Sequence, residues 1–320
     1  MSGPGQPIAI LDDDAVAALL PVRDPRAHKG DNGRVLLVAG SLDFAGAGLL
    51  ASHAAGRAGA GLVTLAVPRA LQPVVAGRYV EVITFGLPEL EPFIVDPDAA
   101  VEALGGIAHD ALVLGPGLRR SDPDDAFVRA LLRAGEAPAV VDAEALNALS
   151  RTPGWHEGLR RPCVLTPHPG EFRRLRPDVE GDLSGDDDAR ERAAREAAEA
   201  WGQVVLLKGA RTVIASPDGE AARAPFENPA LGTGGTGDVL SGVIGALLGQ
   251  RLAPYAAARL GAYLHGTAGE VIRERLGDSG LLASDLPREV AQARHRLARL
   301  RERRTGAGHR VGFAMRRDPA

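Results

Sequence analysis

The stretch Leu231-Gly232-Thr233-Gly234-Gly235-Thr236-Gly237-Asp238 is followed directly by an apolar run at residues 239–248. Four glycines in six positions let the backbone adopt conformations that a side chain would forbid, and they let a ligand approach closely. The apolar run can form a helix, so the loop N–H groups and the positive end of the helix dipole would point to one place. The stretch therefore predicts a glycine-rich loop, a helix, and an anion site where they meet.

Asp238 lies where this loop is expected to become helix. A carboxylate repels phosphate, so Asp238 is poorly explained as a phosphate ligand. We interpret it as a base that takes a proton from a hydroxyl group that is being phosphorylated. The alternative is an ordinary glycine-rich turn in which Asp238 is the helix N-cap. The pattern alone does not separate the two, because isolated glycine patterns are weak evidence.

Composition limits the class of protein. Of 320 residues, 45% are hydrophobic but only 4% are aromatic, which is typical of parallel strands covered tightly by helices. The net charge of −4 argues against a general nucleic-acid binder. A single cysteine, Cys163, excludes an internal disulfide framework and fits a reducing compartment. The N-terminus shows no signal-peptide pattern, and no apolar run has the length of a membrane span. We expect a cytoplasmic protein without membrane or nucleic-acid partners.

Buried strands alternate with helices along the chain. The strands are predicted at residues 34–40, 62–67, 111–114, 139–141, 163–165, 204–207 and 213–215. The helices are predicted at residues 14–20, 49–58, 127–134, 189–201, 239–248 and 256–276, with a glycine-containing loop at 41–48. Pro217-Asp218-Gly219 is a turn signal for a hairpin. The alternation predicts a three-layer α/β domain around a central, mainly parallel sheet. Ligands bind beyond the carboxyl ends of such strands, so the motifs that follow strands should converge there.

The domain organisation is predicted to be simple. Residues 1–27 form an N-terminal lead-in and residues 28–294 form one domain, because no linker composition interrupts them. Residues 295–320 form an arginine-rich tail, which we expect to be a frayed helix followed by a disordered end.

Six motifs carry a resemblance to a known family. They occur in this order: His28-Lys29-Gly30-Asp31, Gly59-Ala60-Gly61-Leu62-Val63-Thr64, Gly115-Pro116-Gly117-Leu118, Thr166-Pro167-His168-Pro169-Gly170-Glu171, Lys208-Gly209, and the long motif from Asn228 to Asp238. Together they resemble the ADP-dependent NAD(P)H-hydrate dehydratases of the ribokinase-like superfamily, over about residues 28 to 294. The resemblance implies a three-layer αβα ribokinase-like fold.

The resemblance also implies a chemistry. Such an enzyme transfers a phosphoryl group from a nucleotide to the ring hydroxyl of (6S)-NADH hydrate or NADPH hydrate, and phosphate then leaves. The products are NAD(P)H, phosphate and, when ADP is the donor, AMP, so the net reaction is that of a lyase. Magnesium and ADP or ATP are implied; we favour ADP, although the motifs do not distinguish the two. A homotetramer is implied as well. A separate NAD(P)H-hydrate epimerase is expected, since 27 residues before His28 cannot hold the epimerase domain that is often fused to this one.

The resemblance assigns roles to particular residues. The catalytic base would be Asp238, and the N–H groups of an anion hole would come from Gly235, Thr236 and Gly237. The contacts to the hydrated dinucleotide would be Ala47, Gly117, His168 and Asp238. The adenine nucleotide would be held by Lys208, Gly209, Ala210, Arg211, Thr212 and Gly237. Glu171 would organise magnesium, in part through water. A zinc site at His168 and Glu171 is disfavoured, because no Cys or His cluster lies nearby in sequence.

Two residues depart from the family pattern, and other functions stay open. Arg119 replaces the last glycine of a usual Gly-Pro-Gly-Leu-Gly, and Glu144 replaces the second acid of a usual Asp-Ala-Asp. The main alternative is a ribokinase-like small-molecule kinase, of the hydroxyethylthiazole or sugar type. His168, in place of the Asn of those kinases, favours the dehydratase. A non-catalytic nucleotide-binding module is disfavoured by the presence of Asp238. A Rossmann dehydrogenase is disfavoured because Gly40-Ser41 lacks the Gly-x-Gly-x-x-Gly spacing.

Overall fold

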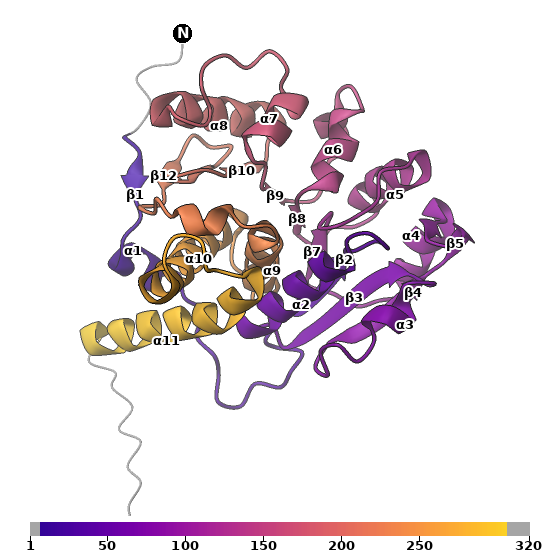
Figure 1. The fold of residues 1–320 in the computed structure, drawn as a ribbon, viewed down its shortest axis with the longest axis horizontal. Helices are drawn as coiled ribbons and strands as arrows, with labels where there is room; N and C mark the ends of the chain where they lie inside the picture. Colours follow the sequence, from indigo (N-terminus) through magenta and orange to yellow (C-terminus); the bar gives the residue numbers. More distant parts are fainter. Residues whose placement is uncertain (1–6, 306–320) are drawn as a thin grey trace, which may run out of the picture.

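The computed structural model describes residues 7–305, and its centre is a single ten-stranded sheet (Figure 1). The strand order is β1-β12-β11-β10-β9-β8-β7-β2-β3-β4. The strands are β1 (Ala9–Ile10), β2 (Arg34–Val38), β3 (Leu62–Pro68), β4 (Ile83–Leu87), β7 (Ala111–Leu114), β8 (Ala139–Val141), β9 (Cys163–Leu165), β10 (Val204–Leu207), β11 (Val213–Ala215) and β12 (Ala221–Arg223). All neighbours run parallel except β10–β11 and β11–β12. A separate hairpin joins β5 (Glu89–Glu91) and β6 (Ile94–Val95).

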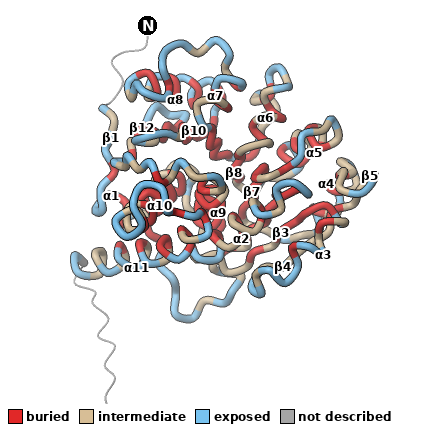
Figure 2. The backbone as a smooth tube through the Cα atoms, in the orientation of Figure 1, coloured by how far each residue is buried: buried red, intermediate tan, exposed pale blue. Residues whose placement is uncertain are grey.

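Helices cover both faces of the sheet. One face is covered by α1 (Asp13–Ala17), α2 (Ala45–Arg57), α3 (Gln72–Val75), α9 (Thr236–Gly249), α10 (Pro254–Leu276) and α11 (Leu286–Thr305). The other is covered by α4 (Pro97–Gly105), α5 (Asp122–Arg133), α6 (Glu144–Ser150), α7 (Pro169–Leu175) and α8 (Asp187–Trp201). Alternate residues of β2, such as Leu36 and Leu37, enter the two separate cores. The buried strands lie between the layers in Figure 2. The predicted three-layer fold with a mainly parallel sheet is confirmed.

Several predicted elements agree with the structure to the residue, and others differ. The predicted strands at 111–114, 139–141, 163–165 and 204–207 are β7, β8, β9 and β10, and the predicted hairpin joins β11 to β12. The loop predicted at 41–48 is wrong over its second half, because α2 already begins at Ala45. Gly48 is inside that helix, where a Cβ would lie 3.0 Å from the Ala39 carbonyl oxygen. The glycine allows close packing against Ala39, the residue after β2, and does not form a turn.

Both ends of the described chain pack onto the domain. Strand β1 pairs with β12, and α1 packs against α11. The boundary expected at residue 294 lies inside α11, where Arg294 donates to the Ala58 carbonyl and, at 2.8 Å, to Gln250 Oε1. The remainder of the predicted tail, 306–320, lies outside the described residues. Between residues 7 and 305, no helix is long and apolar enough to cross a membrane.

Helix α9 is buried between the sheet and α2, and small residues allow this. A Cβ on Gly242 would lie 2.0 Å from the Ala51 carbonyl oxygen of α2, and one on Gly245 would lie 2.2 Å from Val113 Cγ2 of β7. Such distances leave room only for hydrogen at these positions. The close contact on both sides fixes where the N-terminus of α9, and therefore the glycine-rich loop, is placed.

Candidate active site

The glycine-rich loop forms the N-terminus of α9. The N-cap is Gly235, whose φ of 91° lies in the left-handed region that glycine tolerates, and no side chain caps the helix. Asp238 belongs to the first turn and is not the N-cap, so the simple capping interpretation is excluded. The Thr236 N–H donates to the Thr233 carbonyl at 3.3 Å. The Gly237 N–H has no backbone partner among the described residues and can serve an anion.

Lys208, which follows β10, connects the acidic residues of the site. Its Nζ lies 2.9 Å from Asp142 Oδ1 and 3.8 Å from Glu171 Oε2. The other oxygen of Asp142 accepts a hydrogen bond from Ser241 Oγ of α9 at 2.7 Å. Burial lowers the pKa of Lys208, but the charges of Asp142 and Glu171 outweigh burial and hold the pKa above its ordinary value. Lys208 is therefore an ammonium ion at neutral pH.

Asp238 has the most perturbed carboxyl group of the site. Burial, followed by the charge of Asp142, raises the pKa of Asp238 from 3.8 to about 7, while Lys208 opposes the rise. A carboxyl group with a pKa near neutrality accepts a proton far more readily than an ordinary aspartate does. Such a shift, produced by burial and a specific charged neighbour, is characteristic of acid–base residues in active sites.

His168 and Glu171 fix one another at the start of α7. The Gly170 N–H donates to His168 Nδ1 at 3.0 Å, and the His168 N–H donates to Glu171 Oε2 at 2.8 Å. Burial is the main cause that lowers the pKa of His168, so the ring is neutral at pH 7. Since Nδ1 accepts, these bonds assign the ring proton to Nε2, which lies 3.5 Å from Glu171 Oε1.

Ala47 and Gly117, the two small residues predicted to contact the dinucleotide, are in contact beside the glycine-rich loop. A Cβ on Gly117 would lie 2.6 Å from Ala47 Cβ, and its φ of 66° also favours glycine. Leu50 lies one turn further along α2 than Ala47, and its Cδ1 would be 2.7 Å from a Cβ on Gly235. Ala47, Gly117 and the glycine-rich loop are therefore parts of one wall.

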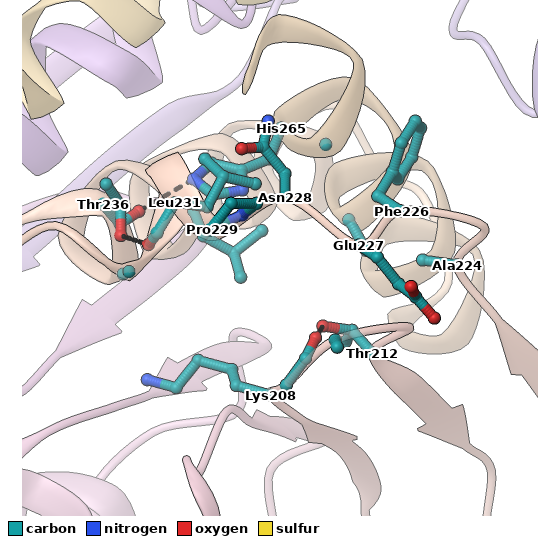
Figure 3. Close-up of a pocket in the computed structure, with 17 residues that line it drawn as sticks. Lys208, Thr212, Ala224, Phe226, Glu227, Asn228, Pro229, Leu231, Thr236 and His265 are labelled. Carbon is teal, nitrogen blue, oxygen red and sulfur yellow. Dashed lines mark hydrogen bonds between the residues drawn. The ribbon is translucent and has the colours of Figure 1, made fainter. Parts of the chain in front are cut away.

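A cavity of about 570 Å³ opens beside Lys208 (Figure 3). It is lined by Lys208, Gly209, Ala210, Thr212, Ala224, Phe226, Glu227, Asn228, Pro229, Leu231, Gly232, Thr236, Gly237, Leu240, Ala262, His265 and Gly266. In Figure 3, Lys208 and Thr212 face Asn228 and His265 across the space. The volume is within the range of small-molecule sites, and apolar surface with few polar groups suits a nucleotide base.

One predicted nucleotide contact, Arg211, does not line this cavity. Its backbone has a φ of 53°, and its N–H donates to the Phe226 carbonyl at 2.8 Å. Its guanidinium pairs with Asp187 at 3.2 Å and with Glu227 at 2.5 Å.

Glu144, one of the two departures from the family pattern, pairs with Arg151 at 2.7 Å.

A family model described as NAD(P)H-hydrate dehydratase matches residues 35–292. The chain belongs to the NAD(P)H-hydrate dehydratase family. The bifunctional NAD(P)H-hydrate repair enzyme Nnr of Moorella thermoacetica is 47% identical over 268 residues, which are 83% of this chain and 50% of that protein. The chain therefore spans about half the length of this curated relative. The ADP-dependent (S)-NAD(P)H-hydrate dehydratase of Xanthomonas campestris pv. campestris is 37% identical over 285 residues, covering 87% of this chain and 94% of that one.

A solved structure is similar over nearly the whole fold. The ADP/ATP-dependent NAD(P)H-hydrate dehydratase of Bacillus subtilis, co-crystallised with ATP and Mg²⁺, superposes with a TM-score of 0.78 at 32% identity. The match covers 91% of this chain and 99% of that one. The expected ribokinase-like fold is confirmed by the solved structures of this kind.

Two features of this NAD(P)H-hydrate dehydratase fold were not found from the sequence. The first is His265 of α10, whose Nε2 lies 2.9 Å from the Thr236 carbonyl oxygen. Burial lowers the pKa of His265 to about 4, so the ring is neutral. The ring therefore donates from Nε2 to this carbonyl and fixes the glycine-rich loop. The second is the bridge that Asp142 forms between Lys208 and Ser241. A lone histidine inside a helix gives no signal of such a contact. In the sequence, Asp142 stood out only as the residue that ends a strand and as the first acid of Asp142-Ala143-Glu144, without a role of its own.

Proposed function

We propose that this chain dehydrates (6S)-NAD(P)H hydrate to NAD(P)H at the expense of ADP or ATP. The observation that carries the proposal is the position and pKa of Asp238. Its carboxyl group lies in the first turn of α9, close to the ammonium group of Lys208, and has a pKa of about 7. Membership of the family supports the same reaction. The names of the Xanthomonas and Bacillus relatives support the use of ADP, ATP or both as the donor.

The proposed reaction has two steps. Asp238 takes the proton of the ring hydroxyl of the hydrate while the hydroxyl oxygen forms a bond to the terminal phosphoryl group of the nucleotide, whose bridging oxygen leaves with the remainder. The lone pair of the ring nitrogen then assists cleavage of the carbon–oxygen bond, and phosphate departs with the bonding electron pair. The resulting iminium ion loses a proton from the neighbouring ring carbon to water or to the departing phosphate, which restores the ring double bond and the neutral nitrogen. With ADP the products are NAD(P)H, AMP and phosphate.

The described residues suit the two substrates. The cavity beside Lys208 suits the adenine nucleotide, with its phosphates directed to the N–H groups of Gly235 and Gly237. The Thr236 N–H would join them only by leaving the Thr233 carbonyl, to which it donates at 3.3 Å. Lys208 would neutralise charge on the transferred group. The hydrated dinucleotide would lie on the side of Ala47, Gly117 and His168. The neutral ring of His168, whose Nδ1 accepts from Gly170, leaves only Nε2–H to donate to it.

Magnesium fits the residues at this place. Among the described residues, no three His, Cys, Asp or Glu side chains gather to hold a metal ion alone. Magnesium in nucleotide enzymes commonly uses one or two carboxylates together with the phosphates, and Glu171, 3.8 Å from Lys208, would be such a carboxylate, acting through water. When bound, the ion would neutralise phosphate charge.

The proposal extends to the setting of the enzyme. We place it in the cytoplasm, which suits the single buried thiol of Cys163. We further propose a homotetramer and an NAD(P)H-hydrate epimerase activity that supplies the reactive stereoisomer.

The test is to incubate the purified chain with NADH hydrate, magnesium and either ADP or ATP, and to follow the near-ultraviolet absorbance of NADH. The proposal predicts a rise that requires nucleotide, and comparison of the two donors names the preferred one. A matched reaction without nucleotide controls for spontaneous dehydration. No rise, combined with nucleotide consumption on a thiazole alcohol or a sugar, would replace the proposal with a small-molecule kinase.

A further inference from the structure

Arg190 of α8 is a buried cation next to the nucleotide loop at residues 208–212. Its exposed fraction is 1%, and its guanidinium is satisfied by three separate segments. Nε donates to the Leu183 carbonyl at 2.8 Å and Nη2 to the Ser184 carbonyl at 2.8 Å, both before α8. Nη1 lies 2.9 Å from Asp187 Oδ1 and also donates to the Ala210 carbonyl of the nucleotide loop.

The contact with the loop is steric as well as polar. A Cβ on Gly209 would lie 3.1 Å from both Cζ and Nε of Arg190, so the guanidinium packs directly on the loop backbone. On the far side of the same peptide, the Arg211 N–H donates to the Phe226 carbonyl at 2.8 Å. The peptide between Ala210 and Arg211 is thus held at both ends, by Arg190 and by the segment that lines the opposite wall of the cavity.

This double hold explains an unfavourable backbone conformation. Arg211 has a φ of 53°, in the left-handed region that costs a non-glycine residue free energy unless its surroundings impose it. Asp187 strengthens the constraint, since its carboxylate binds Arg190 with one oxygen and Arg211 with the other. Without Arg190, the carbonyl of Ala210 would lose its partner and the loop could relax.

We propose that Arg190 is a positioning residue that holds the loop at 208–212 in the conformation that binds the adenine nucleotide. It does not line the cavity and would act through Gly209 and Ala210, which do. The inference rests on the proposed function, in that the nucleotide is ADP or ATP. It predicts a defect confined to nucleotide affinity, whereas a merely structural role predicts lower stability with unchanged affinity.

The chain offers a matched control in Arg161. This side chain is also buried, with an exposed fraction of 2%, and it also donates to backbone carbonyls, those of Leu131 at 3.0 Å and Leu132 at 3.1 Å. Those carbonyls end α5 and do not belong to the nucleotide loop. Replacing either arginine removes a buried guanidinium, although Arg190 also pairs with Asp187 whereas Nη1 of Arg161 has no hydrogen-bond partner among the described residues. Both substitutions are therefore expected to lower the melting temperature, and the nucleotide Kd separates them.

The experiment measures the Kd of ADP and of ATP by titration calorimetry for the wild type, Arg190→Met and Arg161→Met, together with the KM values for nucleotide and hydrate. We expect Arg190→Met to weaken nucleotide binding about tenfold or more, equivalent to about 1.4 kcal/mol per factor of ten, with the KM for hydrate and kcat changed less than twofold. Arg161→Met is expected to keep the wild-type Kd. Arg190→Lys, which retains the positive charge and one donor nitrogen, is expected to recover part of the loss.

The measured affinities and rates either support or overturn the positioning role of Arg190. Equal nucleotide affinity in the two methionine variants, or a kcat loss with unchanged Kd in Arg190→Met, would overturn the inference. If the methionine variants do not fold, Arg190→Lys is compared with Arg161→Lys in the same way. Absence of ADP and ATP binding in the wild type would instead refute the proposed function, so the two failures are distinguishable.

Discussion

Replacing Asp238 by asparagine is predicted to stabilise the fold while it removes the proposed base. The carboxyl group of Asp238 has a pKa of about 7 in the folded protein, against an ordinary value of 3.8, because it is buried close to Asp142. The folded state therefore resists ionisation of this group. The unfolded chain ionises freely, so the folded state loses stability as the pH rises from about 4 to about 7. Asparagine keeps the shape of the side chain and never ionises.

The magnitude follows from the difference between the two pKa values. Each pKa unit corresponds to about 1.4 kcal/mol, so a rise from 3.8 to about 7 gives a penalty of about 4 kcal/mol when the group is fully ionised. The attraction of Lys208 is already contained in this value, because Lys208 lowers the same pKa. By linkage, the gain from Asp238→Asn is about 4 kcal/mol at pH 8 and about 1.5 kcal/mol at pH 5.

The assay is urea unfolding of the wild type and of Asp238→Asn at several values between pH 5 and pH 8. Asp43→Asn, which changes an exposed aspartate, is the control and should show no gain that grows with pH. A variant that is equally stable or less stable than the wild type at pH 8 would refute the reasoning. So would a gain that does not change with pH, because only ionisation of a buried carboxyl group produces the slope.

Three further predictions test other parts of the site. Lys208→Met should weaken nucleotide binding and move the acid limb of the pH–rate profile to higher pH, because Lys208 lowers the pKa of Asp238; an unmoved limb would contradict this. Gly242→Ala should lower the free energy of unfolding by about 1–3 kcal/mol in urea titrations, because its Cβ would meet Ala51, whereas Gly56→Ala, which meets nothing within 4 Å, should not. His265→Gln should remove a loss of up to about 3 kcal/mol as the pH falls from 6.5 to 4, because only the unfolded chain binds that proton readily; a wild-type curve that is flat there would contradict the buried neutral ring.

The sequence predicts most of the sheet, because its central strands are short apolar runs ended by glycine, proline or polar residues. Strands such as β7 and β9 need only this local pattern. The start of α2 was mispredicted because its glycines indicate a turn locally, while Gly48 is selected by contact with a distant carbonyl. The parallel pairing of β1 with β12 brings together residues more than 200 positions apart, and a two-residue strand carries no periodicity that predicts it.

In the candidate site, too, some residues can be recognised from the sequence and others cannot. The glycine-rich loop, Asp238 and Lys208 are recognisable because the chemistry needs contiguous motifs. His265 and Arg190 are not, because each acts by meeting a backbone carbonyl, of Thr236 and Ala210, that any residue could supply. Such contacts depend on the packing of α10 and α8 on the sheet, and no spacing in the sequence records them.

The most direct test of the account compares the wild type with Asp238→Ala in nucleotide-dependent regeneration of NADH from NADH hydrate, with nucleotide Kd measured on both proteins. If Asp238 is the base, the variant folds and binds ADP or ATP as the wild type does, while its turnover falls by about a hundredfold to ten-thousandfold. Turnover close to that of the wild type, with nucleotide binding intact, would contradict the central claim and require another proton acceptor.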